Sequence, residues 1–149
     1  MSATDTLQSI GLRVHQRIYE GTGGAIGHRL IGVPSLLLRT TGRKTGLTRT
    51  NALVYARDGD SYLVVPSNGG EDRPPSWLAN LRAHPDVEIQ IGRRSMPATA
   101  RVVERGDTEY ARLWESVNSN NHHRYEAYQK KTARPIPVVA IRPSSSPLN

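Results

Sequence analysis

The chain has 149 residues, enough for one domain with a core of ordinary size. It contains no Cys, which excludes disulfides, thiolate catalysis and cysteine-ligated metal centres, and no Phe, so its core must rest on Leu, Val, Ile, Ala and Tyr. A formal net charge of +7 favours an anionic partner, which could be nucleic acid, anionic lipid or a polyanionic small molecule.

An amphipathic helix is predicted near the N-terminus, because Leu7, Ile10, Val14 and Ile18 fall on one stripe. Two interpretations stay open: the helix covers one side of the core, or it rests on a membrane surface. No apolar run approaches the roughly 18 residues of a membrane span, and a signal-peptide layout is absent. We therefore expect a cytoplasmic protein, with membrane association through this helix as the alternative.

Beyond Pro34 the sequence is mostly strand-like. Short apolar or alternating runs predict strands at residues 35–39, 50–57, 62–65, 87–91, 96–102 and 136–141. The triplet Asp58-Gly59-Asp60 is typical of a hairpin turn, and Gly92-Arg93-Arg94 predicts a second turn. Residues 66–75, rich in Pro, Gly and charge, should form a loop.

Short helices are predicted between these strands. Ser76 is a candidate N-cap for a helix that Pro85 ends, and Asp107 is a candidate cap for a helix running to Val117. A third helical run is HHRYEAYQKKT, which starts at His122.

This order of elements predicts one antiparallel barrel of the α+β class, because long crossover helices between strands are missing. We expect a single domain over residues 1–149. It would consist of an N-terminal helical lead-in (1–30), the barrel (31–143) and a frayed tail (144–149).

Motifs for protein-based catalysis are absent from the sequence. There is no G-x-S-x-G elbow and no H-E-x-x-H, and the adjacent His122 and His123 would diverge on a helix, so no metal site is predicted. If the protein is an enzyme, its reactive atoms should belong to a bound cofactor.

The most distinctive segment is LLLRTTGRKTGLTRTNALVY, residues 36–55. It places four cations within eleven residues: Arg39, Arg43, Lys44 and Arg49. T-G-R-K-T-G fails as a Walker motif, since the order of residues is wrong and a strand follows. Its glycines still leave amide N–H groups available and Arg binds phosphate or carboxylate well, so the turn is either an anion cradle or a solvated basic hairpin.

The same segment resembles the deazaflavin (F420)-dependent nitroreductase family, which includes F420H2-dependent quinone reductases of actinobacteria. The resemblance continues through SNGG, PSWLANLRAHPDVEIQI and YEAYQKKTARPIPVV, in the family's order. It implies a split β-barrel, similar to the FMN-binding split barrel, with short flanking helices. It also implies binding of coenzyme F420, an 8-hydroxy-5-deazaflavin whose phosphodiester and oligoglutamate tail make it a polyanion.

Residue by residue, the resemblance assigns cofactor binding to three segments. The charged end would lie on Arg43, Lys44, Thr45 and Arg49, with Asn51 and the backbone of Leu53 along the groove toward the ring. The ring would lie beside Pro66, Ser67, Asn68, Gly69 and Gly70, where Asn68 replaces the family's usual Lys. The third segment is Pro75, Ser76 and Trp77, although Trp77 could equally be a core residue, and Asn80 a capping or packing residue.

Tyr125 and Tyr128 lie three residues apart and should share a helical face. In the family this region shapes the substrate pocket, so with Ser67 they are the candidate catalytic residues. Tyr125 would donate a hydrogen bond to a substrate oxygen as negative charge develops. The alternative is two amphipathic tyrosines on a half-buried helix.

The implied activity is hydride transfer from reduced F420 to a quinone or nitro-type acceptor, by a monomer or homodimer. A non-catalytic F420 carrier is the main rival. FMN or haem in the same barrel is a further possibility, disfavoured by the motif. A nucleic-acid binder is disfavoured because aromatic residues make up only 5% of the chain and none interleave with the cations in a recognised motif.

Overall fold

The computed structural model describes residues 33–144, so the helix predicted over residues 7–18 and the last five residues lie outside it. Its strands are β1 (Ser35–Thr41), β2 (Thr48–Val54), β3 (Ala56–Asp58), β4 (Ser61–Val64), β5 (Asp86–Ile91), β6 (Arg94–Val103) and β7 (Val138–Pro143). Its helices are the 3-10 turn η2 (Asn68–Gly70), α2 (Ser76–Ala83), α3 (Tyr110–Asn120) and α4 (Arg124–Gln129).

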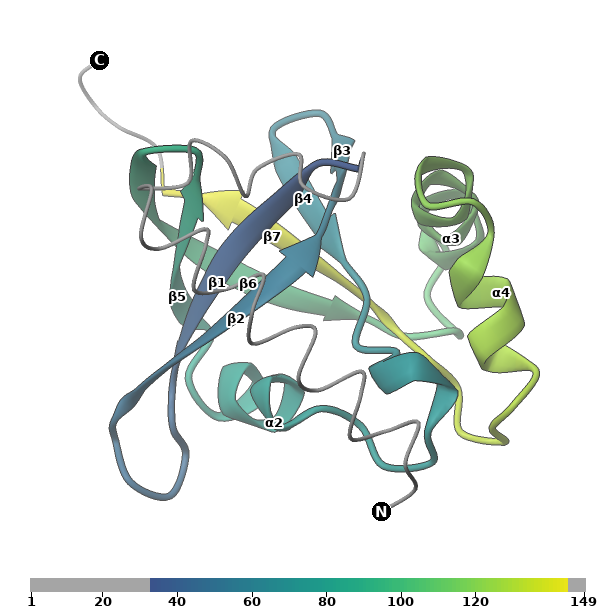
Figure 1. The fold of residues 1–149 in the computed structure, drawn as a ribbon, viewed down its shortest axis with the longest axis horizontal. Coiled ribbons are helices and arrows are strands. Elements are labelled where there is room, and N and C mark those ends of the chain that lie inside the picture. Colours follow the sequence, from purple (N-terminus) through teal and green to yellow (C-terminus); the bar gives the residue numbers. More distant parts are fainter. Residues whose placement is uncertain (1–32, 145–149) are drawn as a thin grey trace.

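The strands form one antiparallel sheet in the order β2-β1-β5-β6-β7-β4-β3, which curls into a half-barrel with α3 and α4 on one side and α2 below (Figure 1). The predicted antiparallel α+β architecture is therefore confirmed. The hairpin turn between β3 and β4 and the turn between β5 and β6 also form where the glycines predict them, since Gly59 and Gly92 both adopt positive φ.

The strand predicted over residues 50–57 is wrong as a single element. The chain breaks at Tyr55, and β2 pairs with β1 at one end of the sheet order whereas β3 pairs with β4 at the other. One continuous run of β-favouring residues thus supplies the two strands at opposite ends of the sheet order, β2 and β3. The strand propensity of the residues cannot predict which distant strands they pair with.

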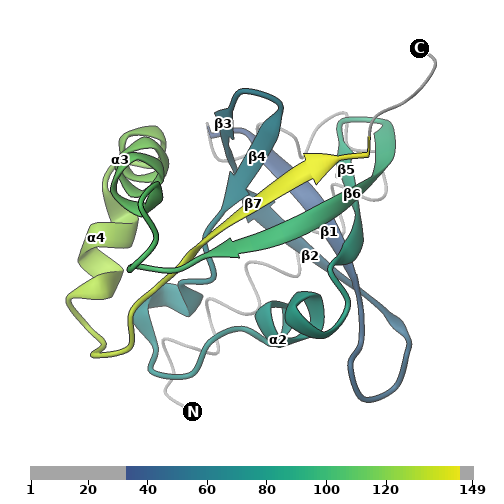
Figure 2. The same ribbon diagram turned by 180° about the vertical axis from the view of Figure 1, so that it is seen from behind.

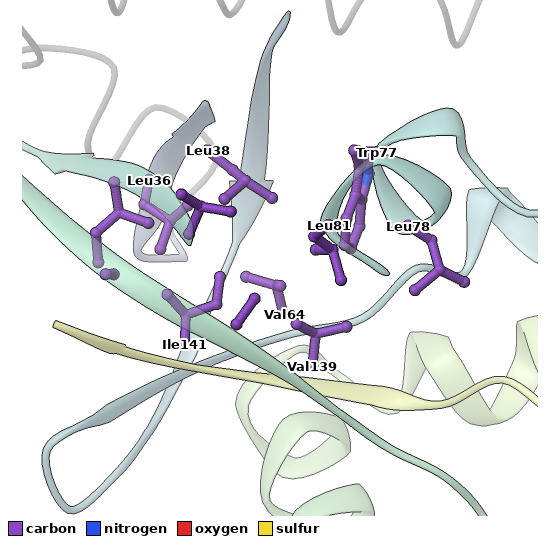
Figure 3. Packing of buried hydrophobic residues seen from close by; sticks show 12 residues of the cluster. Leu36, Leu38, Val64, Trp77, Leu78, Leu81, Val139 and Ile141 are labelled. Carbon is purple, nitrogen blue, oxygen red and sulfur yellow. The ribbon is translucent and has the colours of Figure 1, made fainter. Parts of the chain in front are cut away.

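Two large apolar clusters hold the sheet and its helices together, beside a small third one of Leu37 and Ala52. Inside the curl, Leu36, Leu38, Val64 and Ile141 pack against α2, whose Trp77, Leu78 and Leu81 point into the same cluster (Figure 3). The second cluster lies under α3 and α4 and includes Leu113, Val117 and Ile136. Both clusters are built from Leu, Ile, Val, Ala and aromatic side chains, as the absence of Phe requires.

Both predicted helix caps are wrong. The N-cap of α2 is Pro75, whose extended backbone precedes Ser76, the first helical residue, and no side chain caps this end. Helix α3 begins only at Tyr110, because the Asp107 carboxylate accepts the backbone N–H of Glu104 and closes a turn before the helix.

The third helix starts later than predicted. His122 and His123 both have left-handed backbone, with φ of 55° and 58°, so they form the connection between α3 and α4 and not the first turn of a helix. The last strand also starts later, at Val138, because the Ile136 N–H is bonded to the side chain of Gln129. None of the helices within residues 33–144 is long and apolar enough to cross a membrane.

Candidate cofactor and substrate site

The basic turn between β1 and β2 is tightly hydrogen-bonded. Gly42 N–H donates to the Leu47 carbonyl at 2.7 Å, and Gly46 N–H donates to the Gly42 carbonyl at 2.8 Å. A Cβ on Gly42 would lie 3.0 Å from Thr45 Oγ1 and 3.1 Å from the Leu47 carbonyl, so a side chain there would crowd the turn. The backbone thus holds the cations in a defined loop.

Arg43, Lys44, Thr45 and Arg49 are all exposed, as expected of a cradle for an external anion. Neither the Lys44 side chain nor the Arg49 side chain forms a hydrogen bond or ion pair with another residue that the structure describes. Since like charges at this spacing repel, a bound anion would relieve a cost that the described fold leaves uncompensated.

Arg43 differs from its neighbours because helix α2 holds it. Its backbone N–H and one guanidinium nitrogen donate to Asn80 Oδ1, at 3.1 and 2.9 Å. The Asn80 amide nitrogen in turn donates to Thr40 Oγ1 at 3.3 Å. Asn80 is buried, so the packing role that the sequence suggested for it is confirmed, and its partner is the basic turn.

The inner face of β2 continues from the turn. The register pairs Arg49 with Thr40, Asn51 with Leu38, and Leu53 with Leu36, and directly opposite side chains share a face. Arg49, Asn51 and Leu53 therefore lie in a row on the face that packs toward α2 and the first core cluster. This row is compatible with the predicted groove from the turn toward the ring.

The backbone of Leu53 is not available as the sequence suggested. Hydrogen bonds from Gly42 to Leu47 and from Tyr55 to Pro34 fix the alternation along the pair, which makes Leu53 and Leu36 a hydrogen-bonded pair. The N–H and carbonyl of Leu53 thus point at β1, and only its half-buried side chain can face a ligand.

Trp77 is only 4% exposed and lies in the first core cluster with Leu78 and Leu81 (Figure 3). Of the two interpretations left open for this residue, the structure supports the core residue. Pro75 and Ser76 remain at the solvent side of the helix start, and the Ser76 carbonyl accepts a long hydrogen bond of 3.5 Å from Arg43.

The loop that contains Ser67-Asn68-Gly69-Gly70 has an unusual backbone. Ser67 is right-handed, whereas Asn68, Gly69 and Gly70 have φ of 47°, 67° and 87°. Such a right-to-left succession turns backbone N–H groups toward one side, where they can hold an anion or a carbonyl oxygen. The N–H groups of Asn68 and Gly69 make no hydrogen bond to any described residue.

Asn68, which stands where the family pattern has Lys, closes this loop. Its side-chain amide donates to the Arg73 carbonyl at 2.8 Å. Asn also tolerates the left-handed conformation better than most residues. Compared with the family pattern, Asn68 thus lacks the positive charge of Lys and instead supplies a side-chain amide that closes the turn.

The segment that follows α4 holds the same loop from the other side. Arg134 donates from Nε to the Glu71 carbonyl at 2.9 Å, and from Nη2 to the carbonyls of Ser67 and Pro66 at 2.9 and 3.2 Å. Thr132 Oγ1 donates to Asp72 Oδ1 at 2.6 Å. Burial lowers the pKa of Arg134, and the nearby Asp72 carboxylate opposes that change.

Helix α4 lies directly against this loop. A Cβ on Gly70 would come within 2.7 Å of the Tyr128 carbonyl, so the two backbones touch where only Gly fits. Tyr125 and Tyr128 pack edge to face with ring centroids 6.3 Å apart, which confirms the predicted shared face. The structure thus brings all three candidate catalytic residues, Ser67, Tyr125 and Tyr128, into adjoining elements.

The two tyrosines differ in exposure. Tyr125 is 7% exposed and belongs to the second core cluster, whereas Tyr128 is half-buried at its edge. Burial raises the pKa of Tyr125 to about 12, which keeps its phenol protonated and excludes it as a base. Tyr128 is the more accessible hydrogen-bond donor.

Helix α2 links the two groups of residues. In both views the β1–β2 turn, α2, η2 and α4 follow one another along the lower part of the molecule (Figures 1 and 2). At one end of this series Arg43 connects the turn to α2 by hydrogen bonds, and at the other end Gly70 connects η2 to α4 by direct contact. The arrangement suits an elongated ligand with one anionic end and one end beside the tyrosines.

The fold as a whole is that of known reductases. A solved structure of an F420-H2-dependent reductase (FDR-A) superposes with a TM-score of 0.66 at 35% identity, over 73% of this chain and 94% of that one. A second solved structure, a domain-swapped dimer, gives a TM-score of 0.68 at 33% identity over 95% of this chain and 100% of that one. The curled antiparallel sheet with its few helices is therefore the fold of F420-dependent reductases.

The chain belongs to the F420H(2)-dependent quinone reductase family, whose profile matches residues 11–143. A relative from Mycobacterium tuberculosis, an F420H(2)-dependent quinone reductase, is 56% identical over 87% of this chain and 88% of its own length. The protein is thus an oxidoreductase, an F420-dependent reductase whose cofactor is coenzyme F420.

Sequence reasoning missed three residues that shape the site: Gln129, Thr132 and Arg134. All three stand in the segment YEAYQKKTARPIPVV, which carries part of the family resemblance, but no role followed from it. Gln129 bonds to nearby residues, but Thr132 and Arg134 bond to Asp72 and Glu71, which are 60 and 63 residues away along the chain. A pattern of residue types contains no signal for contacts of this kind.

Proposed function

We propose that the protein transfers a hydride from reduced coenzyme F420 to a quinone. The observation that carries the proposal is the series from the basic turn through α2 to the 66–70 loop and α4, which offers cations at one end and backbone N–H groups with tyrosines at the other. The family name and the quinone reductase relative support the acceptor class.

The phosphodiester and oligoglutamate tail would bind at the turn. Lys44 and Arg49 supply charge, Thr45 a hydroxyl, and Arg43 a guanidinium that Asn80 holds in place. Because Asn80 engages only one of the two Nη atoms, donors of Arg43 remain for a phosphate oxygen.

The deazaflavin ring would lie beside the 66–70 loop, with Asn51 and the Leu53 side chain on the facing strand and Pro75 and Ser76 at the start of α2. The N–H groups of Asn68 and Gly69 are the donors that we assign to ring carbonyl oxygens. Pro66 and Ser67 fix the start of that loop. In this arrangement the curled sheet would be one of the split barrels that bind flavin-type cofactors.

On the acceptor side we assign the hydrogen bond to Tyr128, with Tyr125 packed behind it. Reduced F420 supplies the hydride when bound. The chain would orient the acceptor, exclude water and donate a hydrogen bond to the quinone oxygen that gains negative charge. Tyr128 offers an O–H donor, and burial, which raises the pKa of Tyr125, excludes Tyr125 from acting as a base.

Nitro compounds are a second acceptor class for the same hydride chemistry, and we also propose a homodimer. The second proposal is supported by the similar structure that is a domain-swapped dimer. Light scattering on a sizing column tests it, and a mass of one chain would refute it. The membrane contact suggested for residues 7–18 lies outside the described residues.

The function is tested by titrating purified protein with F420 and, separately, with FMN, followed by addition of menadione to the reduced F420 complex. We expect micromolar or tighter F420 binding, weak FMN binding and reoxidation that depends on menadione. Binding without reoxidation would favour the carrier, and a failure to bind F420 would refute the proposal.

Replacing each tyrosine by phenylalanine tests the acceptor side. Tyr128→Phe should lower turnover about tenfold while cofactor affinity changes little, because a hydrogen bond made in the transition state is lost. Tyr125→Phe serves as the comparison, since it removes a buried hydroxyl one helical turn away. A larger loss of turnover in Tyr125→Phe would transfer the donor role to Tyr125.

A further inference from the structure

Arg134 lies outside every segment that the proposed function assigns to cofactor or acceptor. Its guanidinium nonetheless donates to three backbone carbonyls of one loop, those of Pro66, Ser67 and Glu71. We infer that Arg134 is a positioning residue. It sets the 66–71 backbone so that the N–H groups on the ring side face the cofactor, and it fixes the position of that loop relative to α4. The inference rests on the proposed function.

The planarity of the peptide group makes this effect specific. In a trans peptide the carbonyl of one residue and the N–H of the next point in opposite directions. The Ser67 carbonyl accepts Arg134 Nη2 and also the Gly70 N–H, each at 2.9 Å, so the Asn68 N–H must point away from both donors. The Asn68 carbonyl accepts the Glu71 N–H at 3.2 Å, which fixes the Gly69 N–H in the same way. Arg134 and the loop's own turn together orient both available donors.

The loop needs such support because its backbone is strained. Asn68 adopts φ of 47°, a conformation that costs a residue with a side chain free energy, and two glycines of positive φ follow. Without external bonds, a chain with two adjacent glycines would sample many other conformations. The turn bonds within the loop limit this sampling, and the three carbonyl contacts of Arg134 add the bonds from outside the loop that select one conformation.

The same connection reaches α4. Gln129, the last residue of that helix, donates to the carbonyls of Arg134 and Thr132 at 2.9 and 3.2 Å. Thr132 Oγ1 accepts the Arg134 N–H at 3.2 Å and donates to Asp72. The helix that carries Tyr125 and Tyr128 is thus tied through residues 132–134 to the loop assigned to the ring.

Arginine is required here by geometry as well as charge. Its planar fork reaches carbonyls on both sides, whereas Lys presents one compact ammonium group. Arg134→Lys therefore keeps the charge beside Asp72, but its three N–H donors share one nitrogen and cannot reproduce donors placed at both Nε and Nη2. Arg134→Gln removes both the charge and the fork.

The test compares wild type, Arg134→Gln, Arg134→Lys and the control Arg112→Gln. Arg112 is an exposed arginine bonded to Asp58, away from the loop, and its loss should leave every readout below unchanged. The first readout is hydrogen–deuterium exchange of peptides covering residues 66–73 in the cofactor-free protein. Arg134→Gln should accelerate that exchange at least about tenfold, and Arg134→Lys should accelerate it less, while peptides from β1 stay protected.

The second readout is the F420 complex. Since the basic turn is intact, the affinity for F420 should stay within about threefold, whereas the rate of hydride transfer to menadione should fall about tenfold to a hundredfold. The visible absorbance of the bound deazaflavin should also shift, because its ring would meet a different set of donors.

Unchanged exchange at residues 66–73 in Arg134→Gln would overturn the inference, and so would faster exchange accompanied by unaltered hydride transfer and absorbance. If Arg134→Gln does not fold, Arg134→Lys decides by the same criteria. If wild type itself fails to bind F420, the proposed function is lost, and the exchange experiment alone then shows whether Arg134 orders the loop.

Discussion

The basic turn and the 66–71 loop both depend on arginine, but they use it in opposite ways. At the turn, Lys44 and Arg49 face solvent, and Arg43 uses part of its guanidinium on Asn80. At the loop, Arg134 directs its donors at backbone carbonyls of the protein itself. A cation whose donors are outward can bind a ligand, whereas a cation whose donors are used internally shapes the backbone that binds one.

The loop depends on close contact within the protein most clearly where it meets α4, and Gly70→Ala should disrupt that contact. The new Cβ would lie 2.7 Å from the Tyr128 carbonyl, on a residue with φ of +87°. We expect a loss of stability of about 3 kcal/mol, from steric conflict between two backbones added to an unfavourable conformation. Urea denaturation followed by circular dichroism measures it.

Gly59→Ala is the matched control for this substitution. Gly59 also has positive φ, of +59°, but nothing lies within 4 Å of its Cβ position. It should lose only about 1 kcal/mol, the cost of the left-handed conformation alone. Equal losses in the two variants would mean that the contact between the loop and α4 contributes nothing.

The two regions also differ in how well the sequence predicts them. Arg43, Lys44 and Arg49, the glycines of the turn and the flanking strands are local features, so exposure and hairpin geometry follow from 20 contiguous residues, 36–55. Arg39 is the exception, because it is half-buried on β1 and pairs with Glu88 of β5. The loop could be recognised as a loop, but its conformation depends on Arg134, which is 67 residues from Ser67. The periodicity of residue types along the chain does not predict contacts between distant segments.

The same distinction explains the errors in the fold. Alternation predicted β5 and β6 well, because their side chains divide between core and solvent along each strand. The break at Tyr55 was missed, since it reflects the separation of β2 and β3 to different ends of the sheet order. Asp107 was misassigned as a helix cap because the same carboxylate can equally close a turn, as it does on Glu104 N–H.

Behind the loop, the buried phenol of Tyr125 makes stability depend on alkaline pH. Its pKa is about 12 in the folded state and near the ordinary value of about 10 in the unfolded chain. Between these values the unfolded state has lost the proton and the folded state has not. This contribution is therefore complete below pH of about 10 and is lost as pH rises toward 12, by roughly 2–3 kcal/mol.

Urea denaturation of wild type and Tyr125→Phe at a series of pH values from 9 to about 11.5 measures this loss. The variant should show a shallower decline, because Phe has no proton to lose. Some decline should persist, since burial also raises the pKa of Tyr110. Parallel curves for the two proteins would show that Tyr125 is not desolvated, and would make it accessible to an acceptor after all.

At the turn the expected effect is on binding and not on folding. Arg43→Ala combined with Lys44→Ala should weaken F420 affinity by about tenfold to thirtyfold, about 1.4–2 kcal/mol, because charge-assisted contacts to an anion are lost. Both side chains are exposed, so the fold should remain intact. Fluorescence titration at several salt concentrations measures the affinity, and the variant should depend on salt less steeply than wild type.

The matched control is Arg93→Ala combined with Arg94→Ala. These two arginines are also adjacent and exposed at a hairpin turn, and the change in net charge is the same. They lie at the opposite end of the sheet, because β5 runs antiparallel to β1 and pairs Glu88 with Arg39 near the basic turn. A similar loss of affinity in this control would mean that F420 responds to overall charge, and the turn would cease to be a specific cradle.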